Sequence, residues 1–193
     1  MKQNRENPFF ETYRTPFGTP PFDQIETEQY EPAFDEGIWQ LDEEVRAIAD
    51  NTELPTFENT IIALERSGKL LDKVISAFFN VLNAEADDEM MDISQRVSPK
   101  LSESSNNIYL NEQLFARVKS VYDRKDELHL PMEDARLLEK TFEAFCARGA
   151  ALGPEEKEKY RKLSSELSLL SLTFDQNALK DKNRYELLLT KED

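Results

Sequence analysis

Histidine and cysteine are almost missing from this sequence, which has one of each, His129 and Cys146, in 193 residues. One cysteine excludes an internal disulfide framework and is typical of a reducing compartment. One histidine excludes a histidine pair, the His-x-x-x-His spacing of a zinc-binding helix and a multi-histidine metal cluster. Long apolar runs are missing too, and without the ~18 consecutive apolar residues that a bilayer demands, no transmembrane helix is predicted.

Basic residues are few beside the acidic ones. The sequence has 24 Lys and Arg against 39 Asp and Glu, a net charge of −15. Nucleic acids and anionic membranes bind through clustered Lys and Arg, so neither is a predicted partner. Residues 23–53 hold eleven acids and one base, which is −10 of the −15. A solvated helix face is the favoured interpretation, and an acidic surface for a basic peptide or protein is the alternative.

The start of the chain, Met1–Glu6, is charged and has no apolar stretch after it, so the sequence predicts no signal peptide here. A leader removed before residue 1 stays open as an alternative. Together with the single cysteine, this favours a cytoplasmic location.

Residues 1–22 differ from the rest of the chain. Proline blocks helix formation, while phenylalanine supplies large apolar surface that a disordered tail would not carry. The sequence therefore predicts an extended aromatic arm over 1–22, packed on a helical body. The residues that carry this prediction are Pro8, Phe9, Phe10, Pro16, Phe17, Pro20, Pro21 and Phe22.

Helical periodicity begins near residue 27 and predicts an all-α fold, an irregular array of about six to eight helices over 23–180. Apolar residues recur every three or four positions from Tyr30 to Ile48, and again from Phe57 to Leu82 if Gly68 takes the skipped position. Gly68 either ends a helix or is tolerated inside a longer one, and both alternatives stay open.

Caps and prolines divide the second half of the chain. Asp87 and Asn111 are predicted N-caps, Pro99 is expected to kink or divide its helix, and Pro131 opens another. Pro154 starts the last helix, on which one apolar stripe recurs at spacings of 3, 4, 3 and 4. After Asn177 the helical period fades. The stripe consists of Tyr160, Leu163, Leu167, Leu170 and Phe174, and Tyr185, Leu187 and Leu189 then alternate as in a strand-like tail.

The few residues that could carry chemistry have simpler interpretations. His129 lies in a predicted helix-to-helix connection and has no nucleophile near it in sequence, so a surface role is favoured. Cys146 shares a predicted helix face with Phe142 and Phe145, which predicts a buried, inert thiol.

The clustered acidic residues also have simpler interpretations than a functional site. Asp87, Asp88, Glu89 and Asp92 lack the glycine and terminal glutamate of a calcium loop, so a helix N-terminus is favoured over a cation site. Pairs that share a helix face arise by chance among so many acids. Gly-rich phosphate loops, Gly-x-Ser-x-Gly and Cys-x-x-Cys are absent, so we predict no catalytic or metal-binding residue and leave substrate-binding residues unknown. The pairs are Glu31 with Asp35 and Glu155 with Glu158.

Several strings in order carry a family resemblance. Between residues 7 and 189 the chain resembles the N-terminal part of the thimet-oligopeptidase-like (M3) zinc metallopeptidases, in particular the peptidyl-dipeptidases. The strings include 21–25 (PFDQI), 30–34 (YEPAF), 55–61 (PTFENTI), 63–68 (ALERSG), 78–80 (FFN), 108–111 (IYLN), 114–118 (LFARV) and 174–177 (FDQN).

The resemblance implies a mainly helical peptidase whose two halves flank a narrow channel with zinc at its floor, acting on short peptides. The family's His-Glu-x-x-His motif is absent here, so no site residue is transferred and Zn²⁺ is expected only in a missing C-terminal catalytic part. The chain is then a non-catalytic wall and roof of the channel, inactive by itself, and residues 181–193 begin the connection to its partner. The alternative is a free-standing acidic helical module that kept the scaffold and binds a basic protein.

Overall fold

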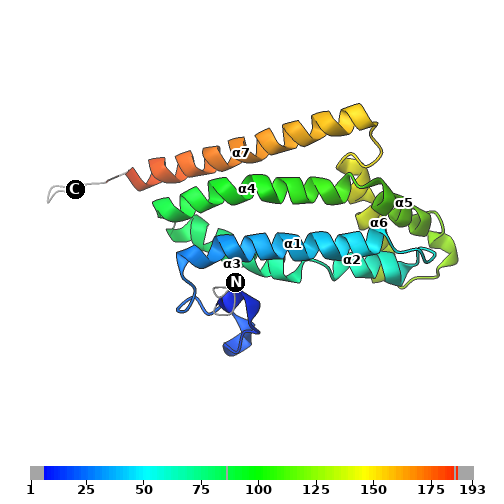
Figure 1. The fold of residues 1–193 in the computed structure, drawn as a ribbon, viewed down its shortest axis with the longest axis horizontal. Coiled ribbons are helices and arrows are strands. Elements are labelled where there is room, and N and C mark those ends of the chain that lie inside the picture. Colours follow the sequence, from blue (N-terminus) through cyan, green and yellow to red (C-terminus); the bar gives the residue numbers. More distant parts are fainter. Residues whose placement is uncertain (1–6, 86, 185, 187–193) are drawn as a thin grey trace, which may run out of the picture.

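A computed structural model describes residues 7–85, 87–184 and 186. Four long helices lie side by side in the order α3, α1, α4, α7, and two shorter helices cross one end of this layer (Figure 1). The described residues form no strand, and the predicted all-α array is confirmed. The helices are α1 (Tyr30–Ala49), α2 (Ala63–Glu65), α3 (Lys69–Glu85), α4 (Asp88–Tyr109), α5 (Glu112–Tyr122), α6 (Met132–Ala147) and α7 (Pro154–Arg184).

Local signals start and stop these helices as expected. The Asp87 carboxylate accepts a hydrogen bond from the Met90 N–H at 2.8 Å, and Asn111 caps α5 in the same way, at 2.9 Å from the Leu114 N–H. A π-helical segment, Phe57–Ile62, leads into α2, and Gly68 then ends this run with a φ of +74°. The break at Gly68 answers the alternative that the sequence left open.

Pro99 does not divide its helix, because α4 continues unbroken from Asp88 to Tyr109. A proline removes one backbone hydrogen bond and crowds the preceding turn. That loss is outweighed here by packing on two sides, since α4 lies against both α1 and α7 and buries Val97 fully.

The aromatic arm contains two 3₁₀ turns, Pro8–Phe10 and Pro16–Gly18, and inserts Phe9 into the core at 1% exposure. Lys73 on α3 holds the arm in place: its ammonium donates to the carbonyls of Phe9 (2.8 Å) and Glu11 (2.7 Å). The same nitrogen lies 3.7 Å from the centre of the Tyr13 ring. Partial burial lowers the pKa of Lys73, and burial raises the pKa of Tyr13 to about 12.

Two hydrophobic clusters form the core, one at each end of α1. The first joins the arm, α1, α3 and α4 around the fully buried Phe34 and Phe78. The second joins the C-terminal half of α1, the π-helical segment, α5 and α6 around Leu114 and Phe145. Neither cluster includes a residue of α7, whose one buried apolar side chain is Leu172.

The last helix is longer than the periodicity predicted, and its apolar stripe faces outward. It continues past Asn177 to Arg184, and it crosses residue 180 without interruption. Four of the five residues in the predicted stripe are more than half exposed, so this apolar face does not pack on the rest of the described chain. The predicted strand-like tail lies outside the described residues, because Tyr185, Leu187 and Leu189 are not among them.

Candidate functional surface

The single histidine and the single cysteine both lie at the surface. His129 is exposed, in the turn before α6, with a φ of +48°. Cys146 is exposed, so the predicted buried thiol is wrong. Leu138 and Phe145 define the inner face of α6, and Cys146 lies one residue, about 100° of helical rotation, beyond Phe145.

Zinc does not fit the donor set of this chain. Within the part of the chain that the structure describes, no group of three or more His, Cys, Asp or Glu side chains could hold a metal ion. The acids at the start of α4 act as a helix N-terminus, where Asp87 caps and Asp88 and Glu89 face solvent. A zinc ion would therefore need ligands from outside these residues.

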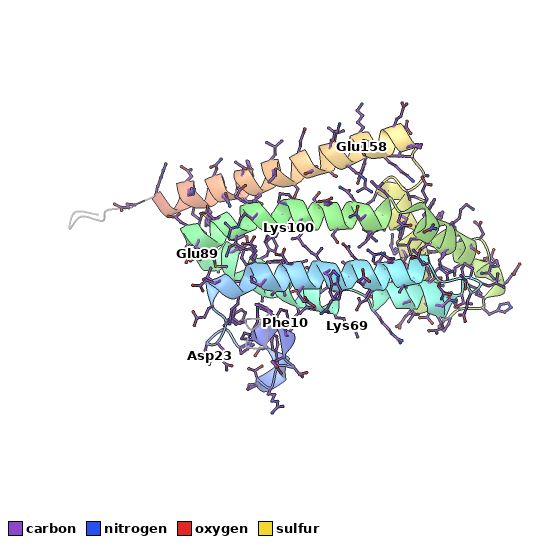
Figure 2. The ribbon with its side chains drawn as sticks, viewed as in Figure 1. Phe10, Asp23, Lys69, Glu89, Lys100 and Glu158 are labelled. Atoms are coloured by element: carbon purple, nitrogen blue, oxygen red, sulfur yellow. The ribbon has the colours of Figure 1, made fainter. Side chains whose placement is uncertain are left out.

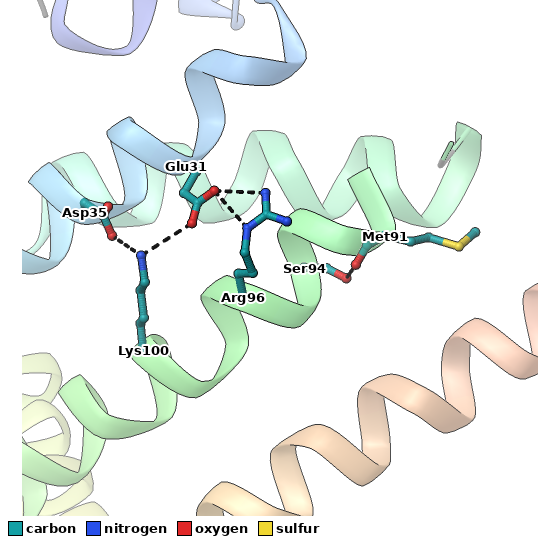
Figure 3. Close-up of polar contacts among 6 residues, drawn as sticks. All are labelled: Glu31, Asp35, Met91, Ser94, Arg96 and Lys100. Carbon is teal, nitrogen blue, oxygen red and sulfur yellow. Dashed lines mark hydrogen bonds and ion pairs between the residues drawn. The ribbon is translucent and has the colours of Figure 1, made fainter. Parts of the chain in front are cut away.

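The carboxylate pair of α1 is engaged by two bases of α4 (Figure 3). Arg96 approaches the Glu31 carboxylate through Nε at 3.0 Å and Nη2 at 2.9 Å, and Lys100 lies 2.6 Å from Asp35 and 3.6 Å from Glu31. The hydrogen bond from Arg96 lowers the pKa of Glu31, which keeps this carboxylate ionised. The pair therefore forms an electrostatic link between α1 and α4.

We predict that Glu31→Gln costs about 0.5–1 kcal/mol of folding free energy at pH 7, since partly exposed ion pairs contribute in this range. A lowered pKa in the folded state stabilises the protein above the ordinary pKa of 4.5, and this contribution disappears as the pH falls through the folded value. Urea titrations between pH 7 and 3 should show the difference between variant and wild type beginning to shrink near pH 4.5 and shrinking further as the pH falls. Glu65→Gln at an exposed position is the matched control, and a pH-independent difference would contradict the prediction.

The remaining acids divide between solvent and structure. Glu155 and Glu158 are exposed in the first turns of α7, where Figure 2 labels Glu158. Two acids of the strongly acidic stretch make specific contacts instead: Asp42 accepts from the Ser104 hydroxyl at 3.1 Å, and Glu44 from the Gly68 N–H at 2.7 Å. The predicted solvated face therefore describes only part of α1.

Arg117 is the polar residue that sequence reasoning did not single out. It is 7% exposed and donates to the carbonyls of Asn51 (2.6 Å) and Glu53 (3.0 Å) and to the side chain of Asn59 (3.0 Å). The guanidinium thus holds the loop after α1 against α5. One signal was available: Arg117 falls on the same face as the buried Val121, where an apolar residue is expected.

A hollow of about 460 Å³ lies between α4 and α7. Small hydroxyls such as Ser164 and Ser168 line it, together with Tyr160. Arg148 also borders it, with its guanidinium carbon 4.2 Å from the centre of the Tyr109 ring. The hollow therefore has a mixed lining, because Leu101 and Leu172 border it beside the hydroxyls.

The outer face of α7 carries several exposed apolar side chains. Exposed apolar side chains at helical spacing on one helix differ from the single exposed ones that every protein surface carries. This surface, which we call the α7 stripe, consists of Leu163 (55% exposed), Leu167 (64%), Leu170 (67%) and Phe174 (72%).

Comparison with known proteins associates this helical chain with peptidases, although no family model matches it. It is 43% identical to the dipeptidyl carboxypeptidase of Escherichia coli K12 over 173 residues, which is 90% of the chain. It is 39% identical to the dipeptidyl carboxypeptidase of Salmonella typhimurium over the same share, and 23% identical to oligopeptidase A of Escherichia coli over 92% of the chain.

The chain is thus a homologue of dipeptidyl carboxypeptidase, and the resemblance expected from its motifs is confirmed. It spans about a quarter of the length of the curated relatives it matches: 25% for both dipeptidyl carboxypeptidases and 26% for oligopeptidase A. In the described residues, no helix combines the length and apolar character needed to cross a membrane.

Proposed function

We propose that this chain is the non-catalytic, N-terminal helical part of a zinc metallopeptidase of the peptidyl-dipeptidase and oligopeptidase type. Its role is to wall and roof the channel that admits short peptides. The observation that carries the proposal is 43% identity over 90% of the chain to a dipeptidyl carboxypeptidase of which the chain spans only 25%. A match that covers nearly all of this chain but only a quarter of the relative is expected of one structural part of a larger enzyme.

The donor set supports a division of labour. One exposed histidine cannot supply a His-x-x-x-His zinc site, so the zinc and the general base of such an enzyme belong to the remainder of the polypeptide. The partners of this chain are then that catalytic remainder and the short peptide substrate. We further propose a cytoplasmic location, supported by the single cysteine.

The proposed organisation keeps three segments. Residues 1–22 form the aromatic arm, 23–180 the helical domain, and 181–193 the start of the connection to the catalytic part. In the described residues α7 extends to Arg184, so that connection would begin as a continuation of this helix.

A chimera tests the proposal. This chain replaces the matching quarter of the Escherichia coli dipeptidyl carboxypeptidase, and dipeptide release from a short peptide is measured with zinc present. We expect release by the chimera and none by this chain alone or by the enzyme lacking its matching quarter. An inactive chimera with a native circular dichroism spectrum would refute a role in this enzyme.

A second measurement addresses the channel wall. A short peptide carrying a photoreactive group is irradiated in the active chimera, and the cross-linked residues are mapped by mass spectrometry. Cross-links within residues 7–184 are expected, whereas cross-links confined to the catalytic remainder would refute the wall. Tight binding of a basic cellular protein by this chain without zinc would favour the alternative interaction module.

A further inference from the structure

The α7 stripe has no partner within the described chain, and its geometry points to one. We infer that Leu163, Leu167, Leu170 and Phe174 form the surface on which the catalytic remainder of the polypeptide docks. The inference rests on the proposed function, namely that this chain is one part of a longer peptidase. It adds the surface through which the two parts meet.

The side of α7 that faces its own domain carries many polar side chains. Helices that end a fold normally bury their apolar face and expose their polar one. Here the apolar stripe is exposed, whereas the side of α7 that faces α4 and α5 combines leucines such as Leu172 with several hydrogen bonds and one ion pair. The pairs are Lys157 with Glu112 (3.0 Å), Arg161 with Asn107 (2.8 Å), Ser164 with Asn106 (2.8 Å) and Gln176 with Gln95 (2.9 Å).

The position of α7 in the fold also supports the inference. It lies at the outer edge of the helical layer, with α4 on one side and its other side free (Figure 1). Side chains along that free side project away from the layer (Figure 2). The apolar face is thus turned toward space that another part of a longer polypeptide could occupy.

The size of the α7 stripe indicates which partner covers it. The stripe covers residues 163–174, about 16 Å of helix, whereas a stable dimer of separate chains buries about 800 Å² on each partner. Four side chains provide less than this. Two parts of one polypeptide associate at an effective concentration near the millimolar range, so a smaller contact suffices. The relatives are about four times as long as the matched segment, which provides such a tethered partner.

The charges beside the stripe support an apolar occupant. Lys162 and Glu166 are both exposed and flank the stripe with opposite signs. A surface that binds a basic peptide would be surrounded by acidic residues alone. The mixed rim instead matches an ordinary interface within one polypeptide, with an apolar centre and polar edges.

Thiol labelling tests the inference. Leu167→Cys is introduced with Cys146→Ser, and its labelling rate with a maleimide is compared between this chain and the chimera described above. We expect labelling in the chimera to be slower by about 10-fold or more, because a covered thiol reacts only during transient opening. Leu54→Cys, in an 81%-exposed loop position, is the matched control and should label equally fast in both.

Each result has one meaning. Equal rates for Leu167→Cys in both proteins would overturn the docking surface. Labelling of the chain by itself that slows as its concentration rises would assign the stripe to a second copy and overturn it too. Dipeptide release reports separately on the proposed function: an active chimera with an uncovered stripe refutes only the surface, and an inactive chimera with a covered stripe refutes only the function.

A charge variant gives an independent readout. Leu167→Glu combined with Leu170→Glu should leave the circular dichroism spectrum of this chain unchanged, because both positions face solvent. The same pair in the chimera should reduce dipeptide release by about 10-fold or more, since burying unpaired carboxylates is costly. Leu54→Glu with Met132→Glu, at positions 81% and 85% exposed, is the control. Equal activity of both double variants would contradict the inference.

Discussion

Replacing Phe78 by alanine is expected to lower the free energy of unfolding by about 3–5 kcal/mol, the usual cost of removing a buried aromatic ring. Phe78 is 0% exposed and lies at the centre of the first core cluster. Its ring meets those of Tyr30 at 5.0 Å, Phe34 at 5.3 Å and Phe79 at 5.2 Å, all edge-on. Urea denaturation followed by circular dichroism measures the loss.

Phe174→Ala is the matched control for Phe78→Ala, because the same side chain is removed from a position that is 72% exposed. In this chain the change should stay within about 0.5 kcal/mol, as for most surface substitutions. A loss at Phe174 as large as that at Phe78 would show that the outer face of α7 is already packed, against the structure described here.

Arg117→Met is expected to lower the free energy of unfolding by about 1.5–3 kcal/mol, since hydrogen bonds to charged groups contribute in this range and the buried guanidinium makes several of them. The methionine keeps much of the side-chain volume, so the loss reports the polar contacts. The carbonyls of Asn51 and Glu53 would lose the guanidinium as their hydrogen-bond donor. Because Asn59 also donates to the Leu54 carbonyl at 3.0 Å, the whole loop should loosen.

Two measurements separate this prediction from a general loss of stability. Chemical denaturation gives the free energy, and hydrogen exchange of residues 51–60 should become faster than that of the rest of the fold. Arg66→Met, at an exposed position after α2, should change neither. Uniform exchange across the chain in Arg117→Met would contradict a local role in holding the loop.

Features that depend on neighbouring residues could be predicted from the sequence. Asp87 and Asn111 cap their helices because a short polar side chain before an apolar period satisfies free N–H groups wherever it occurs. The aromatic arm was recognisable for a similar reason, since proline and phenylalanine act through their own geometry and surface. The continuous helix across Pro99 was not predictable, because packing of α4 on two sides decides it.

Features that depend on distant residues could not be predicted. A stripe from Leu163 to Phe174 defines one face of a helix, and nothing in its spacing says which partner covers that face. The exposure of Cys146 could not be predicted either, because it depends on where α5 meets α6. The candidate surface therefore emerged from the structure, whereas the peptidase resemblance came from motifs that the comparisons confirm.

The two core clusters have a consequence for cooperativity. Among the described residues, Leu41 is the one side chain that packs against both clusters, and it lies midway along α1. Native proteins open in contiguous units whose opening free energies differ. Two units joined mainly through α1 and α4, and sharing one leucine, should therefore protect their amides to different degrees. The arm end and the α5–α6 end would then exchange hydrogen as two foldons rather than one.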